Sequence, residues 1–109
     1  MIFNVVYSSE ARQDLRDIYE YIAYELLEPD TAAGQTNRIM KAARSLEQMP
    51  MRHRLYEEEP WHSQGLRFLP VDNYLIFYLP DEITSVVNII RIMYGGRDVK
   101  RQLSETIEE

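Results

Sequence analysis

The sequence contains no cysteine, so neither a disulfide nor a thiolate metal site can form. This composition suits a reducing compartment, and we expect the cytoplasm. No apolar run approaches the roughly 20 residues that are needed to cross a bilayer. Residues 1–7 also lack the basic segment and long apolar stretch of a signal peptide. We therefore expect a soluble cytoplasmic protein that makes no membrane contact.

Histidine is scarce as well, and the sequence lacks the common cofactor motifs. His53 and His62 lie in a loop-like region, where only carboxylates could complete a metal site. Structural zinc usually takes four Cys or His ligands, so no metal is expected. There is no P-loop, GxGxxG or GxSxG motif, and Gly95-Gly96 stands at a turn without the strand-to-helix context that cradles phosphate. No cofactor is predicted.

Positive charge is in the minority, because 18 Asp and Glu oppose 12 Lys and Arg for a net charge of −6. This balance argues against broad, unspecific affinity for nucleic acid, and no strong direct binding is expected. Bases gather late in the chain, at Arg97, Lys100 and Arg101. They either form a small basic patch or belong to a mixed, solvated surface.

What the sequence does contain is a β-rich segment from Gly65 to Asp98. Three runs rich in aromatic and β-branched residues predict strands at Leu66 to Leu69, Tyr74 to Leu79 and Val86 to Met93. The connections between them hold Pro and Asp and are too short for a crossover helix. Neighbouring strands should therefore run antiparallel, as a three-stranded meander.

A short strand over residues 2–7 and two amphipathic helices are predicted before the meander. Ser9 is the expected N-cap of the first helix, and Pro29 ends it. Its apolar stripe is Leu15, Ile18, Ile22 and Leu26, while Asp14 is among the polar residues assigned to the solvent side.

The second helix is predicted to follow directly, with Asp30 or Thr31 as its cap and Pro50 as its end. Two helices joined by so short a link should form an antiparallel hairpin that covers one face of the sheet. The expected fold is a single α+β domain over residues 1–109. The stripe of the second helix is Ala32, Ile39, Ala43, Leu46 and Met49.

Four residues of the β-rich segment are candidates for chemistry: Arg67, Arg91, Tyr94 and Arg97. An arginine cluster on a concave sheet can hold a phosphate backbone bidentately and stabilise the charged transition state of a 2′-OH attack. A tyrosine can stack on a base or move a proton. The alternative is structural, with the arginines paired to Asp or Glu and Tyr94 an ordinary strand aromatic.

The chain resembles the RelE/ParE toxins of bacterial type II toxin-antitoxin pairs, which include plasmid stabilisation proteins. The resemblance covers almost the whole chain and implies a RelE/ParE-like fold. It rests on the order and spacing of Leu66-Arg67, the strand YLIFY at 74–78, Arg91 to Tyr94, Gly96 to Asp98, and the pattern from Ala11 to Ile22.

The same resemblance separates nuclease from non-nuclease branches. Ribonuclease members commonly carry an arginine where this chain has Leu75, and the RelE-type branch has a tyrosine where it has Leu103. A YoeB-like histidine would stand at Met93. Only Arg97 and Tyr94 match a nuclease pattern, each from a different branch. The chain therefore looks closer to the ParE-like branch, whose members poison DNA gyrase without an evident active site.

The resemblance thus predicts a toxin that inhibits gyrase and is neutralised by a cognate antitoxin. One alternative is a RelE-like, ribosome-dependent mRNA endoribonuclease. A second alternative is a non-toxic binding module of the same fold. Whether the chain is an enzyme therefore stays open at this point. Tyr21 and Tyr24 lie off the apolar stripe and are candidates for antitoxin binding, together with the sheet edges. An antitoxin with basic residues would match the acidic chain.

Overall fold

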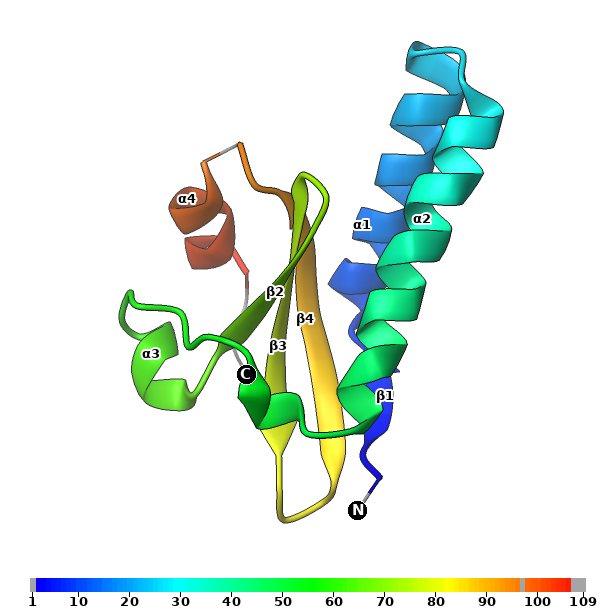
Figure 1. The fold of residues 1–109 in the computed structure, drawn as a ribbon. Helices are drawn as coiled ribbons and strands as arrows, with labels where there is room; N and C mark the ends of the chain where they lie inside the picture. Colours follow the sequence, from blue (N-terminus) through cyan, green and yellow to red (C-terminus); the bar gives the residue numbers. More distant parts are fainter. Residues whose placement is uncertain (1, 97, 107–109) are drawn as a thin grey trace.

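The computed structural model describes residues 2–96 and 98–106. Its framework is an N-terminal strand, a helical hairpin and a β-meander, as the sequence predicts (Figure 1). The main elements are β1 (Asn4–Tyr7), α1 (Ser9–Glu20), α2 (Pro29–Arg44), β2 (Arg67–Val71), β3 (Tyr74–Asp81) and β4 (Val86–Tyr94). Shorter elements are η1 (Tyr21–Glu25), η2 (Ser45–Glu47), η3 (Pro50–Arg52), α3 (Trp61–Gln64) and α4 (Val99–Ser104).

The sheet has the strand order β1-β4-β3-β2. The predicted antiparallel meander is confirmed, and β1 joins it by pairing in parallel with β4 from Val86 to Ile89. Because β4 continues to Tyr94, its last part extends beyond β1. Within the described residues, no strand lies beside Ile90 to Tyr94 on that side. We call this segment the free edge of β4.

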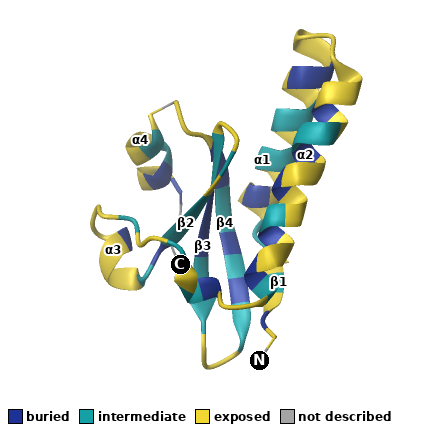
Figure 2. Ribbon diagram, in the orientation of Figure 1, coloured by how far each residue is buried: buried dark blue, intermediate teal, exposed yellow. Residues whose placement is uncertain are grey.

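Helices lie on both faces of the sheet. The α1–α2 hairpin covers one face and reaches beyond the end of the strands, whereas α3 and α4 cover the other face (Figure 1). Buried residues follow both contact surfaces, while the outer side of the hairpin is exposed (Figure 2). The hairpin side is packed around Ile39, Leu46, Ile76, Tyr78 and Ile89. The opposite side is packed around Trp61, Leu66, Phe77, Met93 and Leu103.

Both helix caps differ from those predicted. Ser8, not Ser9, caps α1: its Oγ accepts a hydrogen bond from Ala11 N at 2.9 Å and donates one to Ile90 O at 2.8 Å. The cap therefore also ties the helix start to β4. At α2 neither Asp30 nor Thr31 is the cap, because Pro29 already occupies the first helical turn, where its fixed φ suits the helix.

Two residues of the predicted apolar stripes are exposed. Leu26 follows the π-helical turn η1, whose wider spacing rotates later residues away from the stripe. Met49 lies beyond the ends of α2 and η2, in a left-handed conformation with φ 50°, and its side chain is 73% exposed. Helical periodicity no longer applies at either position.

Asp14 joins α1 to the free edge of β4. Its carboxylate accepts hydrogen bonds from Arg91 Nε at 2.7 Å, Arg91 Nη2 at 2.9 Å and the backbone N–H of Ile92 at 2.8 Å. Arg91 Nη1 also donates to Thr106 Oγ1 at 3.1 Å, which connects the segment after α4. The Asp14 and Arg91 side chains are only 12% and 18% exposed, and hydrogen bonding to Asp14 raises the pKa of Arg91. The assignment of Asp14 to the solvent side is therefore wrong.

A second polar cluster fixes the start of β2. Arg67 Nη1 donates to the His53 carbonyl at 2.7 Å, and Tyr78 Oη donates to the Pro50 carbonyl at 2.7 Å. The His53 ring stands edge-on to Tyr78, and its Nε2 is buried with no hydrogen-bond partner in the described part of the chain. Burial, reinforced by Arg52 and Arg67, lowers the pKa of His53. Burial raises the pKa of Tyr78 to about 12.

The partly buried ion pair predicts an asymmetric response to mutation. Asp14→Ala leaves the partly buried Arg91 guanidinium without its carboxylate and should lower the free energy of unfolding by about 1.5–3 kcal/mol. Replacing both partners, as Asp14→Ala with Arg91→Met, should recover part of that loss. The exposed Asp17→Ala is the matched control, with an expected change below about 0.5 kcal/mol. Urea unfolding measures all three, and equal effects at Asp14 and Asp17 would contradict this account.

His53 predicts a pH dependence of stability. Because its pKa is lower in the folded protein than in the unfolded chain, the unfolded chain binds more protons as the pH falls below about 6.5. Stability should therefore decrease between pH 7 and pH 5 and stop decreasing below the folded-state pKa. His53→Gln should remove this part of the loss in urea titrations, whereas the exposed His62→Gln should retain it. Parallel pH profiles of wild type and His53→Gln would refute the prediction.

Candidate functional site

A groove of about 720 Å³ lies between the hairpin and the free edge of β4. One wall comes from α1, η1 and the start of α2, and the other from the β2–β3 turn and the end of β4. Its floor is Ile92, whose N–H is bound by Asp14. The main lining side chains are Asp14, Asp17, Ile18, Tyr21, Leu26, Gln35, Tyr74, Arg91, Tyr94 and Gln102.

Three of the predicted residues, Tyr21, Arg91 and Tyr94, meet in this groove. Tyr94 stands edge-on to Tyr74, with ring centroids 5.8 Å apart. Burial raises the pKa of Tyr74, and the nearby Tyr94 and Tyr21 add to the effect. A Cβ on Gly96 would lie 2.7 Å from the Tyr94 ring, so this position needs glycine for the chain to pass so closely. The result is an aromatic wall at the end of β4.

The other predicted residues lie elsewhere. Arg67 is at the start of β2, where it binds the His53 carbonyl, and it does not line the groove. Tyr24 is 68% exposed at the end of the hairpin, next to the groove but outside its lining. Arg97 lies outside the described residues. The structure therefore does not bring the four catalytic candidates together as one cluster.

The electrostatics of the groove do not suit a phosphate ligand. Asp14 binds the edge of the Arg91 guanidinium that carries Nε and Nη2, and the remaining nitrogen, Nη1, donates to Thr106. A phosphate would have to displace a partly buried carboxylate to bind that edge of the arginine. Asp17 adds a second negative charge to the lining. The groove offers apolar and aromatic surface, hydrogen-bond donors and acceptors, and a free strand edge, which together suit a polypeptide.

Three positions where the resemblance leads us to expect nuclease residues lie together in this structure. Leu75 and Met93 are directly paired between β3 and β4, and both pack in the same apolar cluster as the fully buried Leu103 of α4. Trp61 and Phe77 belong to the same cluster. The place where nuclease members would carry arginine, histidine and tyrosine is therefore filled by close-packed hydrophobic side chains. Met93 and Leu103 are almost inaccessible to solvent.

Among the groove residues that sequence reasoning missed, Asp14 and Tyr74 do most to shape the groove. The signal for Asp14 was weak, because it is one of several acidic residues on α1 and only its position next to Leu15 indicates the sheet side. Tyr74 opens the aromatic strand, but its contact with Tyr94 depends on the register between β3 and β4. That register is set by the turn and the bulge at Phe77 and Tyr78.

Residues 2–96 and 98–106 contain no group of three or more His, Asp or Glu side chains that could hold a metal ion. Among the helices of this same part of the chain, none is long and apolar enough to cross a membrane.

The fold matches known toxins of bacterial toxin-antitoxin systems. The chromosomal ParDE system of P. aeruginosa aligns with a TM-score of 0.70 at 20% identity, covering 85% of this chain and 96% of that one. The toxin-antitoxin complex RelBE2 of Mycobacterium tuberculosis aligns with a TM-score of 0.62 at 20% identity, covering 86% and 99%. A mutant of the E. coli toxin RelE in the free state aligns with a TM-score of 0.68 at 12% identity, covering 97% of this chain and 95% of that one. At these identities the likeness establishes the fold.

Family membership follows from the sequence. No curated protein matches this chain significantly. The family described as the ParE toxin of the type II toxin-antitoxin system parDE matches residues 5–99, which run from within β1 to the first residue of α4 and include every groove-lining residue except Gln102. The chain therefore belongs to the ParE toxin family of type II toxin-antitoxin systems.

Proposed function

We propose that this chain is a ParE-like toxin that inhibits DNA gyrase in the bacterial cytoplasm and stabilises the replicon that encodes it. The observation that carries the proposal is the apolar cluster of Leu75, Met93 and Leu103. These are the three positions where nuclease relatives are expected to carry their chemical groups. A packed hydrophobic cluster supplies neither a general base nor a cation for the transition state of RNA cleavage.

The charge distribution supports the same proposal. Arg91 is neutralised by Asp14, and Arg67 is held against a backbone carbonyl at the start of β2. Among the described residues that line the groove, an RNA phosphate would therefore meet two carboxylates and one neutralised guanidinium. A protein target needs no such cation, because shape and apolar contact can supply its affinity. The proposed action is binding to gyrase and not cleavage of RNA.

We also propose that a cognate antitoxin binds the groove and the hairpin end. The end of the free edge of β4 can accept an added strand. Ile90 O and Ile92 N–H already bind Ser8 and Asp14, and by the two-residue alternation of a strand the next outward N–H belongs to Tyr94. The hairpin end beside it exposes Tyr21 (56%), Tyr24 (68%) and Leu27 (77%). Exposed side chains of this size suit a hydrophobic partner surface.

The antitoxin segment at this site should carry basic residues. The hairpin near the groove is acidic, with Asp17, Glu20, Glu25 and Glu28 along its exposed side. Opposite charge on the partner would speed association and fix its orientation, while the apolar contacts would set most of the affinity.

Induced expression distinguishes the target. In a bacterial host, induction should activate a DNA-damage reporter while messages stay intact by primer extension, and purified toxin should block supercoiling of relaxed plasmid by gyrase. Co-expression of the antitoxin is the control that should restore growth. Messages cut within ribosomes would instead establish the endoribonuclease alternative. Normal growth with soluble toxin present would make the chain a non-toxic binding module.

The antitoxin site is tested with the product of the small open reading frame next to this gene. Tyr21→Asp with Tyr24→Asp should weaken the complex by about a hundredfold or more, because two aromatic anchors are replaced by charge on an acidic surface. Isothermal titration calorimetry measures the change. Ile83→Asp is the matched control, since Ile83 is 95% exposed in the β3–β4 turn and lies away from the groove.

Two results would overturn the proposed antitoxin site. The first is that no adjacent product binds. The second is that binding is unchanged both in the double tyrosine variant and in Tyr94→Pro, which removes the outward-facing backbone N–H at the free edge of β4. Circular dichroism should show that each variant remains folded.

A further inference from the structure

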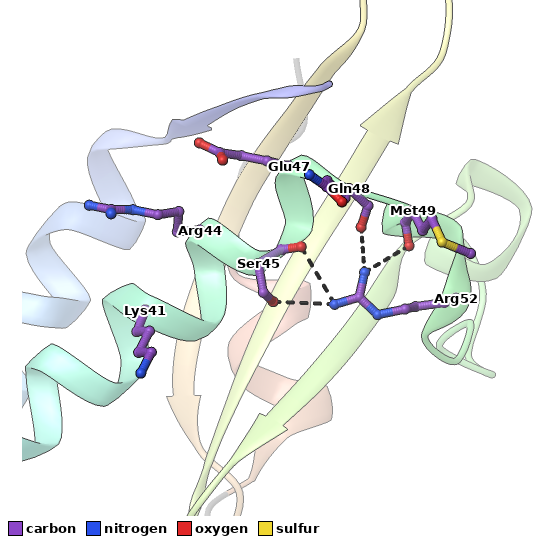
Figure 3. Close-up of a pocket in the computed structure, with 7 residues that line it drawn as sticks. All are labelled: Lys41, Arg44, Ser45, Glu47, Gln48, Met49 and Arg52. Atoms are coloured by element: carbon purple, nitrogen blue, oxygen red, sulfur yellow. Dashed lines mark hydrogen bonds between the residues drawn. The ribbon is translucent and has the colours of Figure 1, made fainter. Parts of the chain in front are cut away.

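A second concavity, of about 540 Å³, lies at the C-terminal end of α2. It is at the opposite end of this helix from the hairpin end and the groove. Figure 3 shows the side chains that line it, which come from the last turn of α2, from η2, from η3 and from the two residues between η2 and η3. Neither the family membership nor the proposed function assigns a role to this surface, which we call the basic concavity.

The wall of the basic concavity is fixed by Arg52. Its Nη1 donates to the backbone carbonyls of Gln48 and, at 3.0 Å, of Met49. Its Nη2 donates to the Ser45 carbonyl at 3.5 Å and to Ser45 Oγ at 3.3 Å (Figure 3). These bonds place a positive charge at the helix C-terminus, where the helix dipole favours it, and hold the turn in one conformation.

Positive charge gathers around this concavity although the chain as a whole is acidic. Lys41, Arg44 and Arg52 line it together with a single carboxylate, Glu47. The five ion pairs found in the described part of the chain involve other Lys and Arg residues, so none of these three cations has a carboxylate partner there. On a protein of net charge −6, such a patch is the place that an acidic partner would approach.

Met49 presents an apolar side chain at the same place. It is 73% exposed, and its backbone has φ 50°, a left-handed conformation that residues other than glycine rarely adopt. The Arg52 bond to its carbonyl helps to hold this conformation. A strained backbone that keeps a flexible, polarisable side chain in solvent is typical of binding surfaces.

We propose that the basic concavity binds an acidic peptide segment of a partner protein. Carboxylates of the segment would pair with Lys41 and Arg44, and one apolar side chain would pack on Met49. Nucleic acid fits less well, because no aromatic residue is among the described residues that line the concavity, so a base has nothing to stack on. Since the chain as a whole is acidic, the local positive charge favours this place for an acidic segment. The site is independent of the gyrase proposal.

A short peptide tests the site directly. The probe is a fluorescein-labelled hexapeptide, Glu-Asp-Glu-Leu-Asp-Glu, followed by fluorescence anisotropy with the intact protein at low salt. We expect saturable binding in the micromolar range, which weakens as salt is raised. Lys41→Glu with Arg44→Glu should weaken it by about tenfold or more, since two attractions become repulsions. The control, Arg12→Glu with Arg16→Glu on α1, changes the net charge by the same amount as the first double variant. It should retain most of the affinity for the peptide.

Met49→Gly separates binding from folding. Glycine suits φ 50°, so this variant should keep or raise the unfolding temperature. Its affinity for the peptide should be severalfold lower, because the Met49 side chain is absent. A peptide with serine in place of leucine should lose affinity by the same factor, and that loss should be absent in Met49→Gly.

Four results would overturn the proposal. Absence of saturable peptide binding is one, and equal loss in both double variants is another, because it would mean unspecific electrostatics. A labelled twelve-nucleotide single strand that binds through Lys41 and Arg44, when the peptide does not, would make the patch a nucleic-acid site. Self-association that depends on the same two residues, seen by analytical ultracentrifugation, would make a second copy of this chain the occupant.

Discussion

The contact between Asp14 and Arg91 determines how the two halves of this fold meet. The partly buried Asp14 carboxylate accepts hydrogen bonds from two of the three Arg91 guanidinium nitrogens and from the backbone N–H of Ile92. At this place β4 has no neighbouring strand among the described residues. An unpaired strand edge would otherwise expose that N–H to solvent or leave it unsatisfied. The same arginine reaches Thr106, so the hairpin, the sheet and the segment after α4 share one polar junction.

This junction also limits the chemistry that the fold can perform. It uses Arg91, the arginine among the described residues that line the groove, for a structural contact. On the other face of the sheet, Leu75, Met93 and Leu103 occupy the region where nuclease relatives are expected to differ. What remains accessible is a free strand edge flanked by exposed aromatic and aliphatic side chains. These are features of a surface that binds proteins. The basic concavity at the far end of α2 adds a surface of opposite charge.

Local sequence patterns were sufficient to predict the sheet and the hairpin. The residue types of the YLIFY strand and of the Val- and Ile-rich β4 favour a strand over a helix. The short turns between neighbouring strands of the meander permit only antiparallel pairing. The residues predicted wrongly depend on geometry between elements. Asp14 is buried only because β4 extends beyond β1, and Met49 is exposed because helical spacing ends at η2. The convergence of Leu75 and Leu103 likewise requires the packing of α4 on the sheet.

The central claim is that the Asp14 junction leaves a strand edge open for a protein partner. Amide hydrogen exchange measured by NMR, with and without the antitoxin, tests it most directly. In the free toxin the Ile92 amide should exchange slowly because Asp14 holds it, while the Tyr94 amide exchanges fast. Antitoxin binding should slow the hydrogen exchange of the Tyr94 amide. Fast exchange at Ile92 in the free toxin, or exchange at Tyr94 that the antitoxin leaves unchanged, would contradict the account.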